Sequence, residues 1–367
     1  MELSQTERMI VDALAGGDVT QAELARKLGV SPSTVRTHAL NARRKGWQPQ
    51  RAYARSTLYD GDGNTVLEWV KTREQDTRQE DAYNAIVDAL KEKIPAAKPV
   101  ACKARKHSPD LLNCYVVTDY HLGMKAWHEE TRDEDWDTRI AEDLLVSWFA
   151  AAIKSAPNAE TAILAQLGDF LHWDGMDAVT PASKHLLDAD TRFQKVVRVA
   201  IRSIRRIVKM LLEKHDRLHI IMAEGNHDPA SSIWLRELFA HYYDDEPRVT
   251  VDTSPDPYYA FEFGATSLFF HHGHKRKVTN VDDVFVAKFR PLFGKTRHSY
   301  AHMGHLHHIE VKETNLMVVE QHRTLASPDA YASRGGWMSG RDAKCIAYHR
   351  DFGEVGRVSV TPDMVKQ

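Results

Sequence analysis

Acidic residues and histidines follow several apolar runs of this 367-residue sequence. Asp119 and His121 come just after the run LLNCYVV, and His305 and His307 come just after YAHM. Alternate residues of an extended chain point to the same side, so both members of each pair can reach one centre. Carboxylate oxygens and imidazole nitrogens bind divalent transition metals, so this spacing predicts a metal centre.

Three more apolar runs end in a similar way. AILAQL is followed by Gly168 and Asp169, LHIIMA leads to GNHD with Asn226 and His227, and SLFFH leads to His272. Ligands of open α/β sheets bind beyond the carboxyl ends of the strands, so five such ends can converge on one site. Neighbouring glycines allow the tight turns that bring the side chains together. This mixture of Asp, Asn and His suits Mn, Fe, Co, Ni or Zn better than Ca or Mg alone.

The elements that position these residues are expected to be strands alternating with helices. From residue 109 onward, the five apolar strands are separated by helix-like segments such as 138–154 and 190–214. This alternation is typical of a layered α/β architecture. Four tryptophans of this region are expected to pack in its core, namely Trp127, Trp136, Trp148 and Trp173. For Trp173, stacking on a base is the alternative.

Residues 1–47 are expected to form a separate domain of three helices. The first helix covers about residues 4–15, the second follows Thr20 as its N-cap, and the third begins at Pro32. Two helices joined by a short, glycine-containing turn are the helix-turn-helix pattern.

Residues 48–108 are expected to connect the two regions. Two strand-like pieces flank the sequence DGDG, which is a good signal for a hairpin and predicts a wing beside the helices. Residues 79–94 are expected to form a short amphipathic helix, and a segment rich in proline and lysine then predicts a linker.

Overall composition excludes several classes of protein. The formal net charge is -2, so any affinity for nucleic acid must be local. Three cysteines without a CxxC spacing argue against a disulfide framework or a zinc ribbon and indicate a reducing compartment. We find no signal peptide and no run near the roughly 20 apolar residues that span a bilayer, so we expect a cytoplasmic protein with no membrane partner.

The ordered motifs D-x-H, G-D, G-N-H-D, H-G-H and G-H-x-H resemble those of the calcineurin-like metallophosphoesterases. The resemblance covers about residues 112–310 and implies a domain over 109–367. It implies an αββα sandwich, in which two β-sheets are flanked by helices. Two divalent metal ions are also implied, with Mn foremost and Fe, Co, Ni, Zn or Mg as alternatives. The implied ligands are Asp119, His121 and His307 for one ion, Asn226, His272 and His305 for the other, and Asp169 as the bridge.

Three further residues receive roles from the same resemblance. His227 resembles the catalytic histidine near the scissile phosphate, and Asp228 resembles the carboxylate that orients it, with turn capping as the alternative. Two cations roughly 3.5–4 Å apart hold a phosphate ester and lower the pKa of a water, and His227 is placed to protonate the leaving oxygen. His172 resembles a histidine of the SbcD-type DNA repair exonucleases and is expected to position the substrate, or else to support a ligand. Phosphoprotein phosphatases have Asp where this chain has His172, which disfavours that branch.

The third expected helix resembles the recognition helix of bacterial winged helix-turn-helix domains. Residues 26–51 hold seven basic residues and no acidic one. Such helices place their N-terminal residues on base edges, while basic groups contact phosphates. A role in protein contacts is the alternative. The predicted DNA-binding residues are Ser33, Thr34, Arg36, Thr37, Asn41, Arg43 and Arg44. A weaker candidate is a basic stripe of the 190–214 helix, which is usually just a solvated face, formed by Arg198, Arg202, Arg205 and Lys209.

These observations predict a bacterial or phage phosphodiesterase, namely a DNA nuclease recruited by its helix-turn-helix. Its expected partner is DNA, and the related repair nucleases point to a homodimer. One alternative is a phosphomonoesterase or small-molecule phosphodiesterase whose helix-turn-helix mediates protein contacts or regulation. The other is a DNA-binding regulator whose second domain only senses metal or ligand.

Overall fold

The computed structural model describes residues 10, 21–44, 52–59, 65–72, 100–101 and 107–365. The chain divides into two compact units, Met1–Asn84 and Ala85–Gln367, and each is described by itself. The boundaries at residues 47 and 108 remain predictions.

The first unit contains a helix-turn-helix and a hairpin. Helix α2 (Gln21–Leu28) and helix α3 (Pro32–Arg44) are joined by a turn in which Gly29 has a φ of 64°. This φ lies in the left-handed region, which glycine adopts without the steric penalty of a Cβ. Strands β1 (Ala52–Tyr59) and β2 (Thr65–Thr72) pair antiparallel. The expected first helix, apart from Ile10, and the expected 79–94 helix lie outside the described residues.

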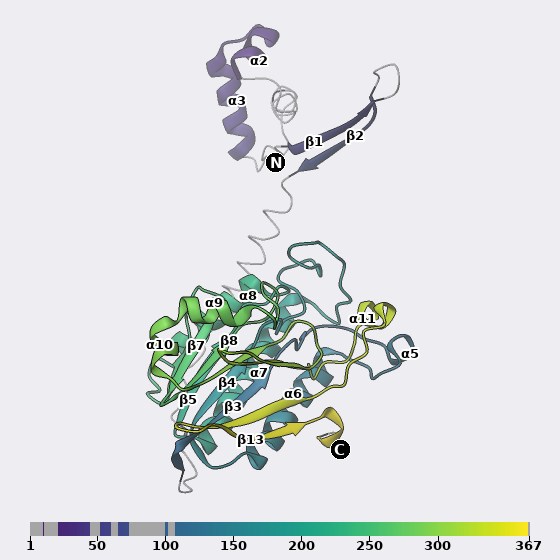
Figure 1. Ribbon diagram of the computed structural model, residues 1–367. Helices are drawn as coiled ribbons and strands as arrows, with labels where there is room; N and C mark the ends of the chain where they lie inside the picture. Colours follow the sequence, from purple (N-terminus) through teal and green to yellow (C-terminus); the bar gives the residue numbers. More distant parts are fainter. Residues whose placement is uncertain are drawn as a thin grey trace. The chain divides into compact units, whose positions relative to one another are not determined.

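The second unit contains two sheets (Figure 1). In spatial order, the six-stranded sheet consists of β13 (Gly353–Val360), β12 (Ala343–His349), β3 (Ser108–Val117), β4 (Ala159–Gln166), β5 (Arg217–Met222) and β6 (Val249–Val251). The five-stranded sheet consists of β10 (Glu310–Glu313), β11 (Val318–Gln321), β9 (His298–Met303), β8 (Thr266–Phe270) and β7 (Tyr259–Phe263). Strands β3 to β6 run parallel to one another, as do β8, β9 and β11. The remaining strands pair antiparallel.

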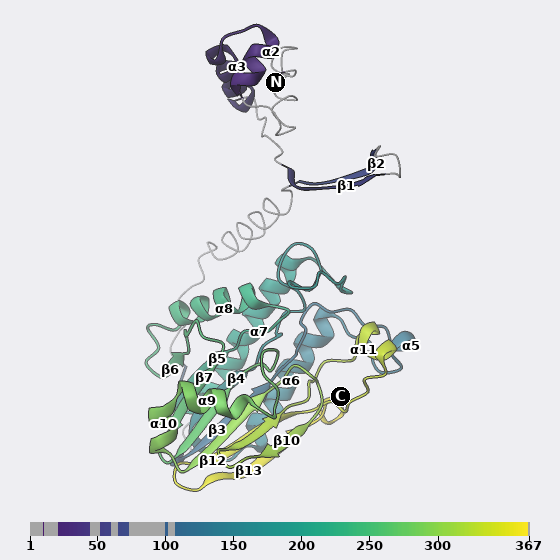
Figure 2. The same ribbon diagram turned by 45° about the horizontal axis from the view of Figure 1, so that its top comes forward.

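Helices cover the outer face of each sheet (Figures 1 and 2). Helices α6 (Thr138–Ser155), α7 (Phe193–Lys214) and α8 (Pro229–Tyr242) share one apolar core with the six-stranded sheet. Helices α9 (Val281–Lys288) and α10 (Arg290–Lys295) pack on the five-stranded sheet. A third core lies between the two sheets. The predicted two-sheet αββα architecture is confirmed. The short elements are α5 (His128–Thr131), α11 (Ala330–Gly335) and η1 (Pro362–Met364).

Strand β3 shows why the apolar runs are continuous rather than alternating. Tyr115 and Val117 pack in the core under the helices, whereas Cys114 and Val116 pack in the core between the sheets. A strand buried on both faces needs apolar residues at every position. Within the described segments, no helix has the length and apolar character needed to cross a membrane.

Candidate metal centre

The seven predicted metal ligands lie together, beyond the carboxyl ends of five strands. Two sets of donor atoms each lie within 4.8 Å of one another. The first set is Asp119, His121 and His307, and the second is Asp169, His272 and His305. The seventh predicted ligand, Asn226, places its Oδ1 3.0 Å from Nε2 of His272. The strands concerned are β3, β4, β5, β8 and β9, so both sheets contribute.

The backbone at these ligands is held in an unusual conformation. Seven non-glycine residues of the described chain have a positive φ, and five of them are predicted ligands, namely Asp119, His121, Asp169, His305 and His307. The left-handed region costs an L-residue roughly 1–2 kcal/mol. Such backbone strain concentrates at functional sites because the surrounding structure must maintain it.

Two glycines leave room for the ligands. A Cβ on Gly225 would overlap the carboxylate of Asp169, and a Cβ on Gly304 would overlap the side chains of Thr118 and Asp119. Any larger residue would therefore push a carboxylate out of the centre.

The first set of donors points toward a common point. Nε2 of His121 lies 3.4 Å from Nε2 of His307, which lies 3.2 Å from Oδ1 of Asp119. The other carboxylate oxygen of Asp119 accepts hydrogen bonds from the His305 amide at 2.8 Å and the Thr118 hydroxyl at 2.6 Å. Oδ1 is buried and has no hydrogen-bond partner among the described residues. This orphaned oxygen beside two imidazole nitrogens is the arrangement that a cation requires.

The second set gives a stronger test of the fit. Nδ1 of His272 donates to the Leu167 carbonyl at 2.9 Å, so Nε2 of the neutral ring carries no proton. That nitrogen faces Oδ2 of Asp169 at 3.1 Å and Oδ1 of Asn226 at 3.0 Å, with Oδ1 of Asp119 at 3.9 Å. Electron pairs of four acceptors repel one another unless positive charge lies among them. The donors therefore fit a divalent cation.

The pKa shifts of the residues in the centre agree with this geometry. Burial lowers the pKa of His272, but Asp169 and Asp119 outweigh burial and raise the pKa to about 9. Burial raises the pKa of both carboxyls, but the surrounding histidines outweigh burial and lower it below the usual range. The centre thus keeps two carboxylates ionised and attracts positive charge, either as a proton on His272 or as metal ions.

His227 lies beside the first set of donors. Its Nδ1 donates to the His172 carbonyl at 2.8 Å, and the hydrogen bonds of the described residues include none at its Nε2. The ring centroid is 4.7 Å from that of His121. The side chain is partly exposed, so it can reach a bound molecule.

His172 supports other residues rather than facing solvent. His172 is 1% exposed, its Nδ1 lies 3.3 Å from Nδ1 of His121, and its ring stacks on that of His227. Burial and the nearby His227 lower its pKa to about 3, so the ring is neutral. These contacts match the alternative of a supporting histidine better than the predicted direct contact with substrate.

The predicted orientation of His227 by Asp228 differs from the structure. The carboxylate of Asp228 accepts from the amides of Asp169 at 3.1 Å and Leu171 at 2.9 Å. Nδ1 of His227 donates to the His172 carbonyl rather than to Asp228. Asp228 instead fixes the turn that carries Asp169, which is close to the capping alternative.

All seven predicted DNA-binding residues belong to α3. Ser33, Arg36 and Thr37 are exposed, whereas Thr34 and Asn41 are partly buried. The Thr37 hydroxyl donates to the Ser33 carbonyl at 2.9 Å. The side chains of Arg43 and Arg44 lie outside the described part, so DNA contact by this set remains a prediction.

Two residues of the basic stripe of α7 contact other residues of the same unit. Arg202 donates to Oε1 of Glu142 at 2.6 Å, and Arg205 lies 4.6 Å above the ring of Tyr242. Packing therefore accounts for these two residues, as the solvated-face alternative allows.

A second buried group of donors was not predicted from the sequence. His302, Glu320 and His322 form this histidine–glutamate cluster, with donor atoms within 4.8 Å. Oε1 of Glu320 accepts from Lys344 at 2.7 Å and from Arg357 at 3.1 Å. The two cations already neutralise the carboxylate, so the cluster does not suit a metal ion. The E-x-H spacing at the end of β11 was the available signal.

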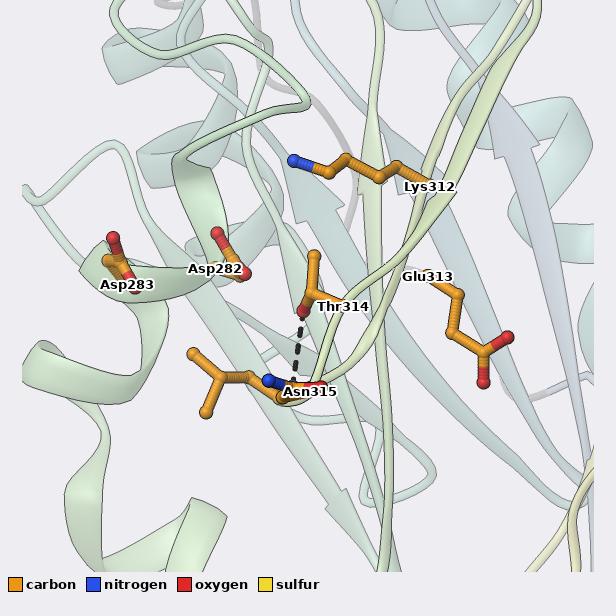
Figure 3. A pocket seen from close by; sticks show the side chains of 7 residues that line it. Asp282, Asp283, Lys312, Glu313, Thr314 and Asn315 are labelled. Carbon is orange, nitrogen blue, oxygen red and sulfur yellow. Dashed lines mark hydrogen bonds between the residues drawn. The ribbon is translucent and has the colours of Figure 1, made fainter.

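A pocket elsewhere shares no residue with the metal centre (Figure 3). It lies between α9 and the β10–β11 turn, and its lining consists of Asp282, Asp283, Lys312, Glu313, Thr314, Asn315 and Leu316. Lys312 donates to the Thr279 carbonyl at 3.2 Å. Its lining brings together no group of three metal-ligating side chains like that of the metal centre.

Comparison with known proteins gives one sequence match and several structural ones. Residues 1–45 match the family described as sigma-70, region 4, which agrees with the helix-turn-helix formed by α2 and α3. No curated protein matches the chain.

The structural matches are distant. A conserved protein of Streptococcus pneumoniae, described as a predicted phosphoesterase, has 12% identity and a TM-score of 0.30, with coverage of 68% of this chain and 98% of the other. Vps29 of Entamoeba histolytica complexed with Zn has 10% identity and a TM-score of 0.27, with coverage of 69% and 99%. The phosphopantetheinyl hydrolase of Mycobacterium tuberculosis has 11% identity and a TM-score of 0.27, with coverage of 63% and 94%. Because these TM-scores are below 0.5, the function of this chain is inferred from its own residues.

Proposed function

We propose that this chain is a dinuclear metal-dependent phosphoesterase that hydrolyses phosphodiesters, and that its substrate is DNA recruited by the helix-turn-helix. The observation that carries the proposal is the convergence of seven donor side chains in which acceptor atoms face one another. An orphaned Asp119 oxygen and the unprotonated nitrogen of His272 both require nearby positive charge.

The chemistry follows from the charges around the centre. Divalent cations bound there would act as Lewis acids on a phosphoryl group and would activate a water. Asp119 and Asp169 stay ionised and hold positive charge at the point where a phosphate anion must bind. Arrangements of this kind stabilise the charge that develops on phosphoryl oxygens.

His227 is the proposed proton donor to the leaving oxygen. The His172 carbonyl accepts from Nδ1, and this hydrogen bond fixes the orientation of the ring. As an imidazolium, the ring can then donate its Nε2 proton to the leaving oxygen. General acid catalysis of this kind typically contributes about 10²–10⁴-fold to a rate.

The choice of DNA rests on the first unit. Residues 26–44 carry basic residues without an acidic one, and α3 exposes Ser33, Arg36 and Thr37. A helix-turn-helix with these features places its second helix in the major groove. The metal centre alone is compatible with a smaller phosphodiester.

The test uses the full chain with Mn²⁺ and three substrates: end-labelled single-stranded DNA, end-labelled duplex DNA and bis-p-nitrophenyl phosphate. We expect hydrolysis of all three, and its loss in His227→Ala. Replacement of Arg36 and Asn41 by alanine is expected to slow DNA cleavage only, whereas Lys154→Ala, an exposed basic residue of α6, serves as the matched control. Cleavage of bis-p-nitrophenyl phosphate with intact DNA would reject the nuclease and favour the small-molecule phosphodiesterase. No hydrolysis of any substrate would reject the phosphoesterase.

A further inference from the structure

Exposed aromatic side chains gather on residues 324–341, the segment that contains α11. Tyr331 is 67% exposed and Trp337 is 58% exposed, and both belong to the segment that contains α11. Trp127, which directly precedes α5, is 52% exposed, although the sequence predicted core packing for it. Trp136, Trp148 and Trp173 are buried as predicted. Contiguous exposed apolar patches, unlike single exposed residues, mark sites of interaction with other molecules.

The segment is attached to the metal centre at its start. The Thr324 hydroxyl donates to the Asp119 carbonyl at 2.6 Å. Asp329, which caps α11 by accepting from the Ala332 amide at 2.8 Å, is among the charges that act on His307. Tyr331 therefore lies two residues after a carboxylate whose charge raises the pKa of His307, in a segment that begins with a hydrogen bond to Asp119.

Polar contacts hold the segment firmly against its surroundings. Arg341 donates to the Leu325 carbonyl at 2.8 Å, which closes the loop between these two residues. The hydroxyl of Ser333 donates to the Glu130 carbonyl at 3.3 Å, so α11 is tied to α5. Both views place α11 beside α5 (Figures 1 and 2). Rigid presentation of aromatic rings lowers the entropy that binding must overcome.

Local sequence explains how Trp337 is displayed. Gly336 ends α11 with a φ of 71°, and the Trp337 amide then donates to the Ala332 carbonyl at 3.1 Å. The indole lies against Gly335, where any Cβ would overlap the ring. Its centroid is 5.0 Å from that of Tyr331. The two rings thus form a small aromatic surface, with Met338 exposed beside them in the sequence.

Charge pairing makes this surface compatible with a polyanion. Arg334 pairs with Glu130 at 2.6 Å, and Arg341 pairs with Asp133 at 3.0 Å and Glu134 at 2.7 Å. Three of the five acidic residues at positions 129–135, namely Glu130, Asp133 and Glu134, are therefore paired with an arginine. Bases stack on exposed aromatic rings whatever their identity, but only when they are free of a complementary strand.

We propose that Tyr331 and Trp337 form a stacking surface for unpaired bases that flank the scissile phosphodiester, so that the metal centre cleaves single-stranded nucleic acid faster than duplex. This inference rests on the proposed function and specifies the form of its substrate. A duplex contributes no free base faces, so it gains little from this surface.

The first test is kinetic and uses the full chain. Trp337→Ala and Tyr331→Ala are expected to lower kcat/KM on single-stranded DNA about tenfold, in line with typical base stacking on aromatic residues. Hydrolysis of duplex DNA and of bis-p-nitrophenyl phosphate should stay within about twofold. Phe352→Ala is the matched control, because Phe352 is 70% exposed at the β12–β13 turn, beside the first residues of β3 rather than its carboxyl end. Equal losses on all three substrates, or no loss on single strands, would overturn the inference.

The second test separates this inference from the proposed function. A single-stranded oligonucleotide containing 5-iodouracil is photo-crosslinked to the full-length His227→Ala protein with Mn²⁺, and the crosslinked residues are mapped by mass spectrometry. We expect crosslinks at Trp337 or Tyr331. Crosslinks confined to other residues would overturn the inference even if the wild-type protein cleaves DNA. Crosslinks at these residues without cleavage by the wild type would reject the proposed nuclease and keep the stacking surface.

Discussion

The metal centre and the histidine–glutamate cluster use the same residue types in opposite ways. Both bring buried imidazoles within 4.8 Å of a carboxylate. In the metal centre, Nε2 of His272 faces oxygens of Asp169 and Asn226, and no lysine or arginine lies against them in the described hydrogen bonds and ion pairs. In the cluster, Lys344 and Arg357 both bind Glu320.

The difference teaches what defines a metal site in this fold. Burial of a carboxylate is costly unless positive charge accompanies it. The cluster supplies this charge from two side chains, and burial of Glu320 is outweighed by His322 and Lys344, so the pKa falls to about 2. The metal centre leaves the charge to be supplied from outside. Unsatisfied acceptors, rather than histidines as such, identify the binding site.

The largest expected effect is that of Asp169→Asn. Asp169 provides an oxygen to the second set of donors and accepts from the His227 amide at 2.7 Å, so removal of its charge weakens both metal binding and the turn that holds His227. We expect hydrolysis of bis-p-nitrophenyl phosphate to fall on the order of 10³-fold. Bound metal, measured by inductively coupled plasma mass spectrometry, should fall as well. Glu320→Gln is the matched control and should keep its metal. Equal metal loss in both variants would remove the distinction between the two regions.

His227→Ala should lower activity without lowering metal content. His227 contacts the His172 carbonyl and is not one of the seven predicted ligands, although one of its ring nitrogens lies within 4.8 Å of one of His121. We therefore expect its loss to remove a proton donor rather than a ligand. We expect a loss of about 10²–10³-fold in kcat. Measurement of metal per chain beside the rate decides the interpretation, because metal loss comparable to that of Asp169→Asn would make His227 a ligand.

Lys344→Met should destabilise the protein without affecting the metal centre. Lys344 is buried and donates to Glu320 at 2.7 Å, so its removal leaves a buried carboxylate with Arg357 as its main cation. Breaking a buried pair in this way costs about 3 kcal/mol of unfolding free energy. Urea denaturation measures this loss, and Lys154→Met, on the exposed face of α6, is the control. A change below about 0.5 kcal/mol would show that Lys344 does not compensate Glu320.

Much of the metal centre could be predicted from the sequence because its signals are local. Each ligand pair lies within a short motif at the end of an apolar run, and parallel strands bring such ends to the same edge. The left-handed backbone at residues such as Asp119 and His305 could not be predicted, because neither is the glycine that normally marks a positive φ.

Contacts between distant segments account for what the sequence did not reveal. Asp228 was assigned to its neighbour His227, but its carboxylate reaches amides 57 and 59 residues away. The histidine–glutamate cluster likewise joins two strands, β9 and the end of β11, and its cations come from β12 and β13. Trp127 was expected in the core, but it is exposed just before α5. No local pattern in the sequence distinguishes it from the three buried tryptophans.

The smallest expected effect is a change in how stability depends on pH. His302 is 1% exposed between His322 and Tyr348, and burial lowers its pKa to about 4 despite the opposing effect of Glu320. An unfolded histidine has a pKa near 6.5, so on acidification the unfolded chain takes up a proton before the folded chain does. Stability from His302 is therefore fully present above about pH 6.5 and is lost as the pH falls toward 4, with a loss of up to about 2 kcal/mol between pH 7 and pH 5.

Urea denaturation of the wild type and His302→Gln at both pH values isolates this contribution, since the histidines of the metal centre titrate in both proteins. We expect the wild type to lose more stability than the variant between pH 7 and pH 5. Equal losses would mean that His302 is protonated in the folded protein. The cluster would then carry an additional buried positive charge beside Lys344. In that case, the positive charges around Glu320 would exceed its negative charge, whereas the metal centre lacks such charges of its own.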